Sequence, residues 1–298
     1  MSYTTVINHR KSAGQLDLFG ASVDAKPVIN PDGSIKGCVL IYAPSGQAGE
    51  FAPLALNPYK GCGHSCSYPC YVPEFTHQPR DEFNAGAVLK KDFIARLRKE
   101  AAKYQAAGIT EQVTLCFATD PYNNNDTMPT RAALEILIEH GLAFCTLTKG
   151  GTRALRDLDL FRRDRDCYAA TLIGDDKLAK RWESNAPLSS NRIAALQAFH
   201  EAGIFTYISL EPVIDPAATM AVVEATHSFV DLYKLGQLNH SKFAAVRDRR
   251  DFTLRMLDVF NRLSARHYIK RDLQAFLPTN YPNPLRVSQH HGETRHAW

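Results

Sequence analysis

Apolar residues follow two alternating patterns along the chain. Short apolar runs typical of buried strands alternate with segments in which apolar positions recur every three or four residues, as in amphipathic helices. The segment 91–107 has the helical pattern, with Phe93, Ile94 and Leu97 among lysines and arginines. Strands are predicted at 38–42, 113–118, 142–148, 168–173, 204–210 and 230–235, and further helices at 130–140, 152–163, from 190 onward, 216–226 and 252–266.

Strands that alternate with helices predict parallel pairing, because each helix returns the chain through a right-handed crossover. About six such units are enough to curl a sheet into a barrel. We therefore predict an α/β fold, a partial (β/α)6 TIM-like barrel. Residues 1–48 are expected as an N-terminal extension, 49–245 as the barrel, and 246–298 as a helical C-terminal segment and tail. Functional residues are expected at the carboxyl ends of the strands.

One stretch, residues 57–73, interrupts these patterns and reads NPYKGCGHSCSYPCYVP. It holds Cys62, Cys66 and Cys70, three of the seven cysteines, among residues that favour a tight loop. Thiolates this close together suit an iron–sulfur cluster or zinc. A structural zinc site normally has four protein ligands, and His64 is the candidate for a fourth. Its place in a short turn favours a hydrogen-bonding role instead, and chance clustering is the third alternative.

Composition fits a single large domain. The chain has 298 residues, of which 45% are hydrophobic, so it can bury a full core. It has no apolar run of membrane-spanning length and no apolar signal segment near its start, and its cysteines show no disulfide framework. We expect a cytoplasmic protein without a membrane partner.

The net charge of +4 is only mildly basic, but the charge is unevenly placed. The segment from residue 241 onward is rich in arginine and lysine, which is compatible with contacts to the phosphates of DNA. The alternative is a solvated face of a helix.

The sequences LALNPYKGCGHSC and YPCYVP resemble the radical SAM superfamily, within it the spore photoproduct lyase-like, or DNA repair photolyase-like, branch. The resemblance covers roughly residues 50–240. The usual spacing is Cys-x3-Cys-x2-Cys with an aromatic residue directly before the last cysteine. Here Pro69 stands between Tyr68 and Cys70, which gives Cys-x3-Cys-x3-Cys.

The resemblance implies a [4Fe-4S] cluster on Cys62, Cys66 and Cys70, with the fourth iron open to the amino and carboxylate groups of S-adenosylmethionine. It also implies an electron donor, reductive cleavage of S-adenosylmethionine, and a 5′-deoxyadenosyl radical that abstracts hydrogen from the substrate. A DNA lesion would have to leave the base stack to reach such a site. The alternatives are radical chemistry on RNA, a peptide or a small molecule, and a non-catalytic metal-bearing repair protein.

The strand ends supply the candidate cofactor ligands. Thr119 and Asp120 can accept hydrogen bonds from an ammonium group, although Asp120 with Pro121 also suits the start of a turn. Lys149 can pair with a carboxylate. The remaining candidates are Tyr68 at the cysteine loop, Thr171 and Glu211 for the ribose, and Gly236 for a close approach of the adenine.

Cys116 is the candidate catalytic residue, as the donor that returns hydrogen to a product radical. Spore photoproduct lyase carries such a cysteine just before the Thr/Ser-Asp segment, where this chain has Ala118. Cys116 lies two residues earlier, on the same face of a strand. The alternative for Cys116 is core packing, and Cys145 and Cys167 are expected as buried thiols.

The N-terminal extension contains Gln15-Leu16-Asp17-Leu18-Phe19. This peptide resembles the short motif by which bacterial replication and repair proteins bind the sliding clamp, in the extended-peptide mode. We expect the clamp as a partner on this basis. The alternative is that the apolar residues fasten the extension to its own domain.

Overall fold

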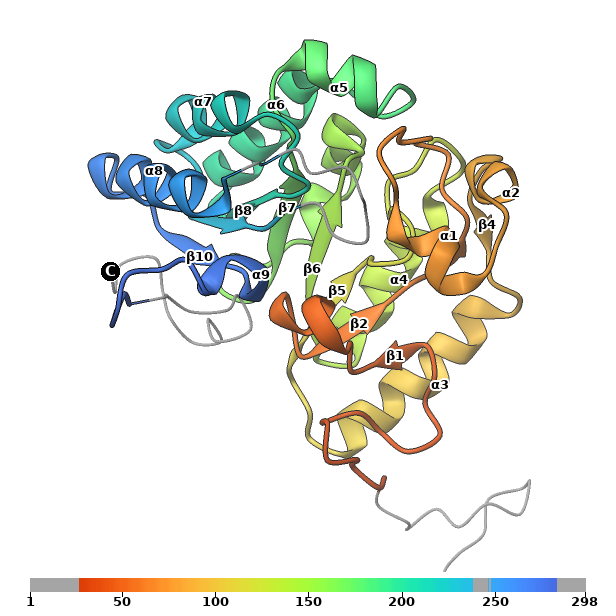
Figure 1. Cartoon of the computed structure of the whole chain (residues 1–298). Helices are drawn as coiled ribbons and strands as arrows, with labels where there is room; N and C mark the ends of the chain where they lie inside the picture. Colours follow the sequence, from red (N-terminus) through yellow and green to blue (C-terminus); the bar gives the residue numbers. More distant parts are fainter. Residues whose placement is uncertain (1–26, 238–245, 247, 283–298) are drawn as a thin grey trace, which may run out of the picture.

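The centre of the molecule is an eight-stranded sheet, in the order β1-β2-β5-β6-β7-β8-β9-β10. The structure, a computed structural model, describes residues 27–237, 246 and 248–282 (Figure 1). All neighbouring strands of this sheet are parallel except β1 and β2. The strands are β1 (Ile41–Tyr42), β2 (Leu54–Leu56), β5 (Gln112–Leu115), β6 (Ala143–Thr148), β7 (Cys167–Thr171), β8 (Phe205–Leu210), β9 (Leu232–Leu235) and β10 (His267–Ile269).

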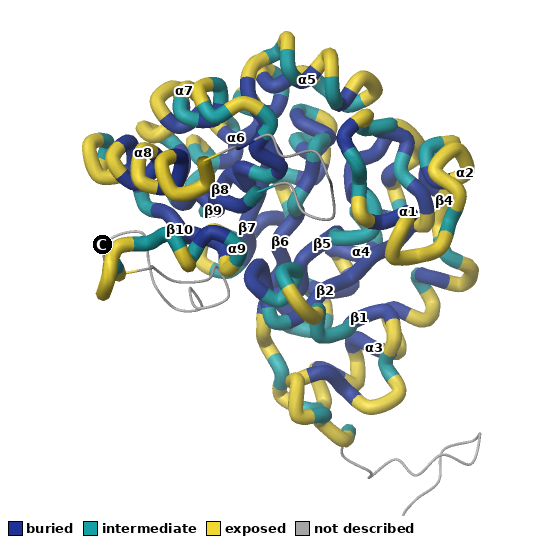
Figure 2. The backbone as a smooth tube through the Cα atoms, viewed as in Figure 1, coloured by how far each residue is buried: buried dark blue, intermediate teal, exposed yellow. Residues whose placement is uncertain are grey.

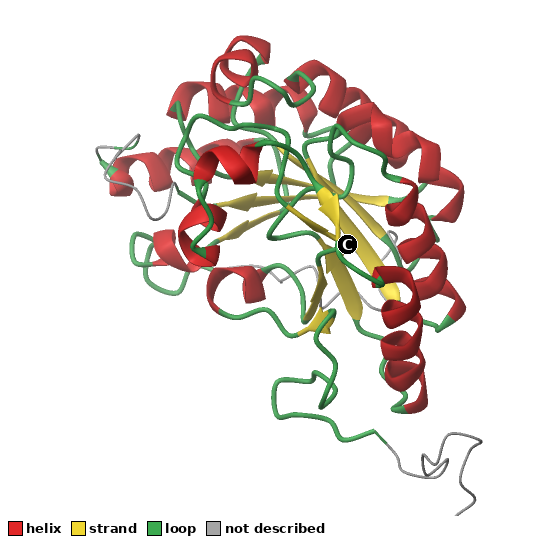
Figure 3. Cartoon of the chain, turned by 90° about the vertical axis from the view of Figure 1, so that its right-hand side faces the viewer, coloured by secondary structure: helices red, strands yellow, loops and turns green. Residues whose placement is uncertain are grey.

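Helices surround the outside of this curved sheet (Figure 3). They are α1 (Tyr71–Thr76), α2 (Arg80–Asn84), α3 (Phe93–Ala106), α4 (Met128–Glu139), α5 (Asp176–Trp182), α6 (Ser189–Glu201), α7 (Pro216–Thr226), α8 (Arg249–Arg262) and α9 (Arg271–Gln274), with the 3-10 helices η1 (Gly46–Glu50) and η2 (Gly151–Leu160). A small antiparallel pair, β3 (Tyr59–Lys60) and β4 (Val88–Leu89), stands apart from the sheet. No helix in the described ranges is long and apolar enough to cross a membrane.

Two buried apolar clusters occupy the two faces of the sheet. Neighbouring strand residues fall into different clusters, as Phe144 and Cys145 do, because successive side chains point to opposite faces. The larger cluster packs the sheet against the outer helices, whose far sides are exposed (Figure 2). The smaller cluster fills the inner face with Phe51, Cys145, Cys167, Ala169, Tyr207 and Leu232.

The predicted fold class, a partial barrel of alternating strands and helices, is confirmed. The helix α7 begins and ends where the sequence predicts. Its start has a local cause, because Pro216 occupies the first helical position and the Asp215 side chain accepts hydrogen bonds from the N–H groups of Ala217 and Ala218. The strands predicted within 142–148, 168–173, 204–210 and 230–235 are present as β6, β7, β8 and β9.

Four predicted elements differ in type or by more than two residues in extent. The strand expected at 38–42 is reduced to β1, which pairs antiparallel with β2. The strand expected to reach Ala118 ends at Leu115, because the N–H groups of Phe117 and Ala118 donate to the Asn57 side chain instead of a neighbouring strand. The helix expected at 152–163 is the 3-10 helix η2. The helix expected at 252–266 starts earlier, at Arg249, because Asp248 caps it.

The sheet gains a further parallel strand, β10, from the segment predicted to be helical. Its two ends, β1 and β10, do not pair with each other. Residues 46–51, which we call the closing segment, lie between them (Figure 1). There the Glu50 side chain accepts hydrogen bonds from the Tyr268 hydroxyl at 2.9 Å and the Arg271 N–H at 2.8 Å. The closing segment therefore joins the two ends of the sheet.

Candidate functional site

The cysteine loop lies beside the carboxyl ends of the parallel strands. Cys62, Cys66 and Cys70 are half-buried free thiols. Burial raises the pKa of Cys62 to about 12 and that of Cys66 to about 11. Desolvated thiols of this kind remain protonated until a metal replaces the proton. The donor set therefore suits a thiophilic metal centre.

The arrangement of the three thiols bears on which centre they can hold. Cys66 interacts electrostatically with both Cys62 and Cys70. Across the described residues, no three His, Cys, Asp or Glu side chains are grouped so that they could hold a metal ion. A single zinc ion needs all its ligands converged at about 2.3 Å. In a four-iron cluster each thiolate binds its own iron, so three soft ligands spaced along one loop fit a cluster chemically.

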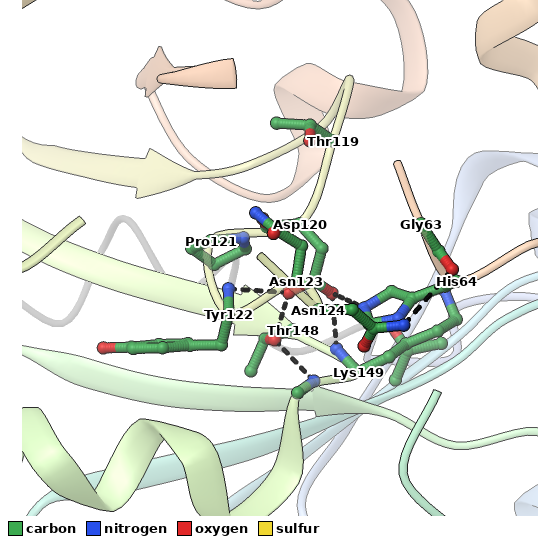
Figure 4. A network of polar contacts seen from close by, with 12 residues as sticks. Gly63, His64, Thr119, Asp120, Pro121, Tyr122, Asn123, Asn124, Thr148 and Lys149 are labelled. Atoms are coloured by element: carbon green, nitrogen blue, oxygen red, sulfur yellow. Dashed lines mark hydrogen bonds and ion pairs between the residues drawn. The ribbon is translucent and has the colours of Figure 1, made fainter. Parts of the chain in front are cut away.

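Asp120 joins the cysteine loop to two strand ends (Figure 4). One carboxylate oxygen accepts hydrogen bonds from the Tyr122 N–H at 2.8 Å and the Thr148 hydroxyl at 2.5 Å. The other accepts from the Lys149 N–H at 2.7 Å and lies 3.1 Å from His64 Nε2. Asp120 is buried, and these four partners come from the loop after β5, the end of β6 and the cysteine loop. The three segments are therefore fixed to one another.

These contacts bear on the roles predicted for Thr119, Asp120 and His64. Burial acts to raise the pKa of Asp120, but the His64 charge and the hydrogen bonds lower it well below its ordinary value. The bond from the Tyr122 N–H is the turn contact expected for the Asp-Pro pair. The Thr119 hydroxyl donates to the Gly61 carbonyl at 2.7 Å. Contact of Thr119 and Asp120 with a cofactor ammonium stays a prediction.

Lys149 and Tyr68 meet at one buried carboxylate, that of Glu183. The Tyr68 hydroxyl donates to Glu183 Oε1 at 2.6 Å, and Lys149 Nζ lies 3.8 Å from the same oxygen. Arg192 Nη1 donates to Glu183 Oε2 at 2.5 Å and also to the Thr171 carbonyl at 2.9 Å. Three predicted cofactor residues, Tyr68, Lys149 and Thr171, are thus brought together by two residues that were not predicted.

Glu211 and Gly236 lie together at the ends of β8 and β9. Glu211 forms an ion pair with Lys270, which follows β10. A Cβ atom at Gly236 would lie 2.8 Å from Lys270 Cδ and 3.0 Å from Glu211 Cδ, so a glycine makes room for this pair. The Tyr71 ring is partly exposed, but its hydroxyl, which donates to the Phe117 carbonyl at 2.6 Å, is desolvated; this raises the pKa of Tyr71, and the charges of Cys70 and Glu211 act in the same direction. Glu211 is therefore within electrostatic reach of the cysteine loop.

Cys116 lies just beyond the end of β5 and belongs to the larger apolar cluster. Burial raises its pKa well above the ordinary value, and the Asp120 charge adds to this. The packing alternative agrees with this position, and hydrogen return by Cys116 stays a prediction. Cys145 and Cys167 are buried thiols on the inner face, as expected.

Five polar residues of the site and its surroundings were missed by sequence reasoning: Glu50, Glu183, Arg192, Lys234 and Lys270. Lys234 carried a usable signal, because a lysine flanked by Tyr233 and Leu235 inside a predicted strand is unusual for a buried sheet. Glu50, Glu183 and Lys270 stand in segments with no periodic pattern, and each has a partner that is distant in the sequence. Arg192 lies on the helix predicted from residue 190 onward, where a single arginine gives no sign of burial. Only the fold brings them together.

Solved structures identify the architecture. One is a spore photoproduct lyase mutant with bound AdoMet and dinucleoside spore photoproduct, with a TM-score of 0.60 and 12% identity over 83% of this chain and 86% of that chain. The chain has the fold of spore photoproduct lyase. SuiB of Streptococcus suis, bound to S-adenosylmethionine, gives a TM-score of 0.57 and 11% identity over 75% of this chain and 52% of its own. The expected resemblance to radical SAM enzymes is confirmed at the level of this fold.

Sequence comparisons add relatives without a described activity. No family model matches the chain. Uncharacterized proteins of Mycobacterium tuberculosis and Mycobacterium bovis are 30% identical over 173 residues, which is 53% of this chain and 49% of theirs. The chain therefore spans about half the length of these curated relatives.

Proposed function

We propose that this protein is a radical SAM enzyme of the spore photoproduct lyase-like branch. Cys62, Cys66 and Cys70 hold a [4Fe-4S] cluster beside S-adenosylmethionine. One observation carries the proposal: the loop with three thiols lies at the carboxyl ends of the strands, in the fold of a protein whose structure contains AdoMet. When bound, the cluster supplies the electron that cleaves S-adenosylmethionine to methionine and a 5′-deoxyadenosyl radical.

The chain's own residues bind and orient the cofactor in this proposal. Lys149 offers an ammonium group, partly exposed and next to Cys66, to the methionine carboxylate. Thr171 and Glu211 face the ribose from β7 and β8. Gly236, which makes room for the Glu211–Lys270 pair at the end of β9, lies beside the adenine in this proposal. The surrounding buried side chains exclude water from the reacting centre.

We further propose a nucleic acid as substrate and a lyase-like reaction on it. Two exposed aromatic side chains stand on α1, the helix that directly follows Cys70: Tyr71 at its start and Phe75 one turn later. Arg181 lies over the Trp182 ring of α5 at 5.4 Å, and α5 contacts the cysteine loop. Exposed aromatic rings and arginines beside a reacting centre are what stacking against unpaired bases requires. RNA, a peptide or a small molecule is the alternative substrate.

Recruitment by the sliding clamp belongs to the same proposal. The peptide expected to bind it, Gln15–Phe19, lies outside the described residues. In the basic C-terminal segment, Arg255 pairs with Asp251 at 3.7 Å and Arg262 with Glu224 at 2.7 Å. Such exposed pairs fit the alternative of a solvated helix face, so the case for DNA depends on α1 and α5 rather than on α8.

Anaerobic reconstitution with iron and sulfide tests the proposed function. The wild-type chain should bind about four irons and, once reduced, convert S-adenosylmethionine to 5′-deoxyadenosine. Cys66→Ala should lose the cluster, because two thiols cannot hold it. Cys38→Ala, which changes a half-buried thiol outside the loop, is the matched control and should keep full iron content.

The outcomes separate the alternatives. A Cys66→Ala variant with wild-type iron content would refute the ligand assignment. Zinc in place of iron, or a cluster that never cleaves S-adenosylmethionine, would favour the non-catalytic metal-bearing protein. Affinity for single-stranded DNA that falls steeply with salt would separate a nucleic-acid substrate from a peptide or a small molecule.

A further inference from the structure

The last residue of α5 and the three that follow it run alongside the cysteine loop. The Ser67 N–H donates to the Trp182 carbonyl at 2.8 Å, and the Asn185 N–H donates to the His64 carbonyl at 3.3 Å. The Asn185 side chain also donates to the Ser65 hydroxyl at 3.3 Å. We call residues 182–185 the supporting segment. It contacts the loop between the first and third cysteines.

Glu183 is the buried centre of the supporting segment. Its side chain and that of Arg192 are both 0% exposed, and they form an ion pair at 2.5 Å. Burial acts to raise the pKa of Glu183, but the charges of Arg192 and Lys149 and the hydrogen bonds from Tyr68 and Arg192 outweigh it, and the pKa is lowered. Glu183 is therefore an anion held among two cations and a hydroxyl.

The partners of Glu183 come from separate parts of the site. Tyr68 stands between the second and third cysteines, and Lys149 directly follows β6. Arg192 belongs to α6 and also binds the carbonyl groups of Thr171 and Pro187. One carboxylate thus connects the cysteine loop to the ends of β6 and β7. A fully buried ion pair contributes little net stability, so stability alone gives no reason to place one here.

We propose that Glu183 is a positioning residue, which holds the cysteine loop through Tyr68 and sets the charge around the cluster through Lys149 and Arg192. The electrostatic half of this inference rests on the proposed function, whereas the support of the loop does not. In Glu183→Gln the Tyr68 hydroxyl donates to a neutral amide oxygen, a weaker hydrogen bond than one to a carboxylate, and the two cations lose their counter-charge. The loop then loosens, and the surplus positive charge favours the reduced cluster.

Hydrogen exchange of the full-length, metal-free chain tests the support of the loop. In Glu183→Gln, amides of residues 64–68 should exchange at least tenfold faster than in wild type, because the Ser67 N–H and the Trp182 carbonyl that accepts from it are no longer held together through Tyr68 and Glu183. Asp166→Asn is the matched control. Asp166 is a buried carboxylate paired with Arg162 at 2.6 Å, but it lies at the amino end of β7, away from the loop. It should leave exchange at residues 64–68 unchanged.

The reduction potential of the reconstituted protein tests the electrostatic half. Glu183→Gln should shift the reduction equilibrium roughly tenfold toward the reduced cluster, about 59 mV for a one-electron couple. Asp166→Asn should not shift it. Unchanged exchange in Glu183→Gln would overturn the inference. Faster exchange with an unchanged reduction potential would also overturn it, because a residue that only supports the loop would give this result.

Tyr68→Phe keeps the inference testable if Glu183→Gln does not fold. It removes the hydrogen bond to Glu183 and an interaction with Cys66, but no charge, so exchange at residues 64–68 should rise. Wild-type exchange in Tyr68→Phe would contradict the proposed support. A wild-type chain that assembles no cluster would refute the proposed function instead, and exchange would still decide whether Glu183 holds the loop.

Discussion

Phe75 is the most exposed large apolar side chain of the described residues, with 82% of its surface accessible. It stands on α1, the helix that begins directly after Cys70. An aromatic ring gains nothing from packing in this position, whereas a base stacked on it is stabilised by about 1–3 kcal/mol. The exposure of Phe75 beside the cysteine loop is compatible with the nucleic-acid substrate that we propose.

At this scale we predict that Phe75→Ala weakens binding of a single-stranded oligonucleotide by roughly tenfold, following from the stacking energy of one base. Fluorescence anisotropy at fixed salt measures the affinity. Val39→Ala is the matched control, because Val39 is 64% exposed and lies outside the site. Equal affinities of wild type and Phe75→Ala would show that this ring does not touch nucleic acid.

Among the elements, the closing segment contacts residues more than 180 positions away in the sequence. Glu50 is 1% exposed, and Phe51 lies over both inner-face lysines, 4.7 Å from Lys234 Nζ and 4.8 Å from Lys270 Nζ. The Lys234 ammonium also donates to the Glu50 carbonyl at 3.0 Å. A few residues of 3-10 helix thus cover the inner face where the two ends of the sheet fail to pair.

Glu50→Ala should lower the free energy of unfolding by about 2–4 kcal/mol, because the Tyr268 hydroxyl and the Arg271 N–H lose a charged acceptor. It should also speed alkylation of Cys145 and Cys167, which are buried on the inner face. Urea denaturation and mass spectrometry of the alkylated thiols measure the two effects.

The exposed Glu111 supplies the control for this experiment, and Glu111→Ala should change neither quantity. Alkylation of Cys145 and Cys167 at the wild-type rate in Glu50→Ala would mean that the closing segment stays in place without its carboxylate.

For the whole molecule, Lys234 makes stability depend on pH. Burial lowers its pKa from 10.5 to about 7. Between these values the unfolded chain binds a proton that the folded chain does not, so the contribution of Lys234 to the free energy of unfolding rises with pH. Below pH 7 both states bind the proton, and the destabilisation by the buried ammonium is present in full.

Lys234→Met removes this dependence. The variant should be more stable than wild type at pH 7, by about 1–4 kcal/mol, and the difference should shrink as the pH rises to 9. Urea denaturation at pH 7, 8 and 9 gives the comparison, with the exposed Lys177→Met as control. A difference that is constant across this range would show that Lys234 is not the titrating group.

How much of this molecule the sequence predicts depends on how local each cause is. Alternating apolar patterns are local, so the barrel and the bounds of α7 could be predicted, together with the position of the cysteine loop at the strand ends. The strand β10 could not be predicted, because it has only three residues and no turn signal separates it from the helix before it. Glu183 could not either, since it meets Tyr68 across 115 residues of sequence and no local pattern links them.

The contact between Glu50 and Tyr268 spans 218 residues, so the first and last parts of the sheet are completed together. During synthesis the three thiols leave the ribosome when the strands that will enclose them have not yet been made. The nascent chain therefore carries the cysteine loop, for which we propose metal binding, before the strands around it have formed. A cluster that is delivered after residue 271 has been synthesised would enter a folded site. A cluster that is delivered earlier would meet thiols that are exposed to oxygen.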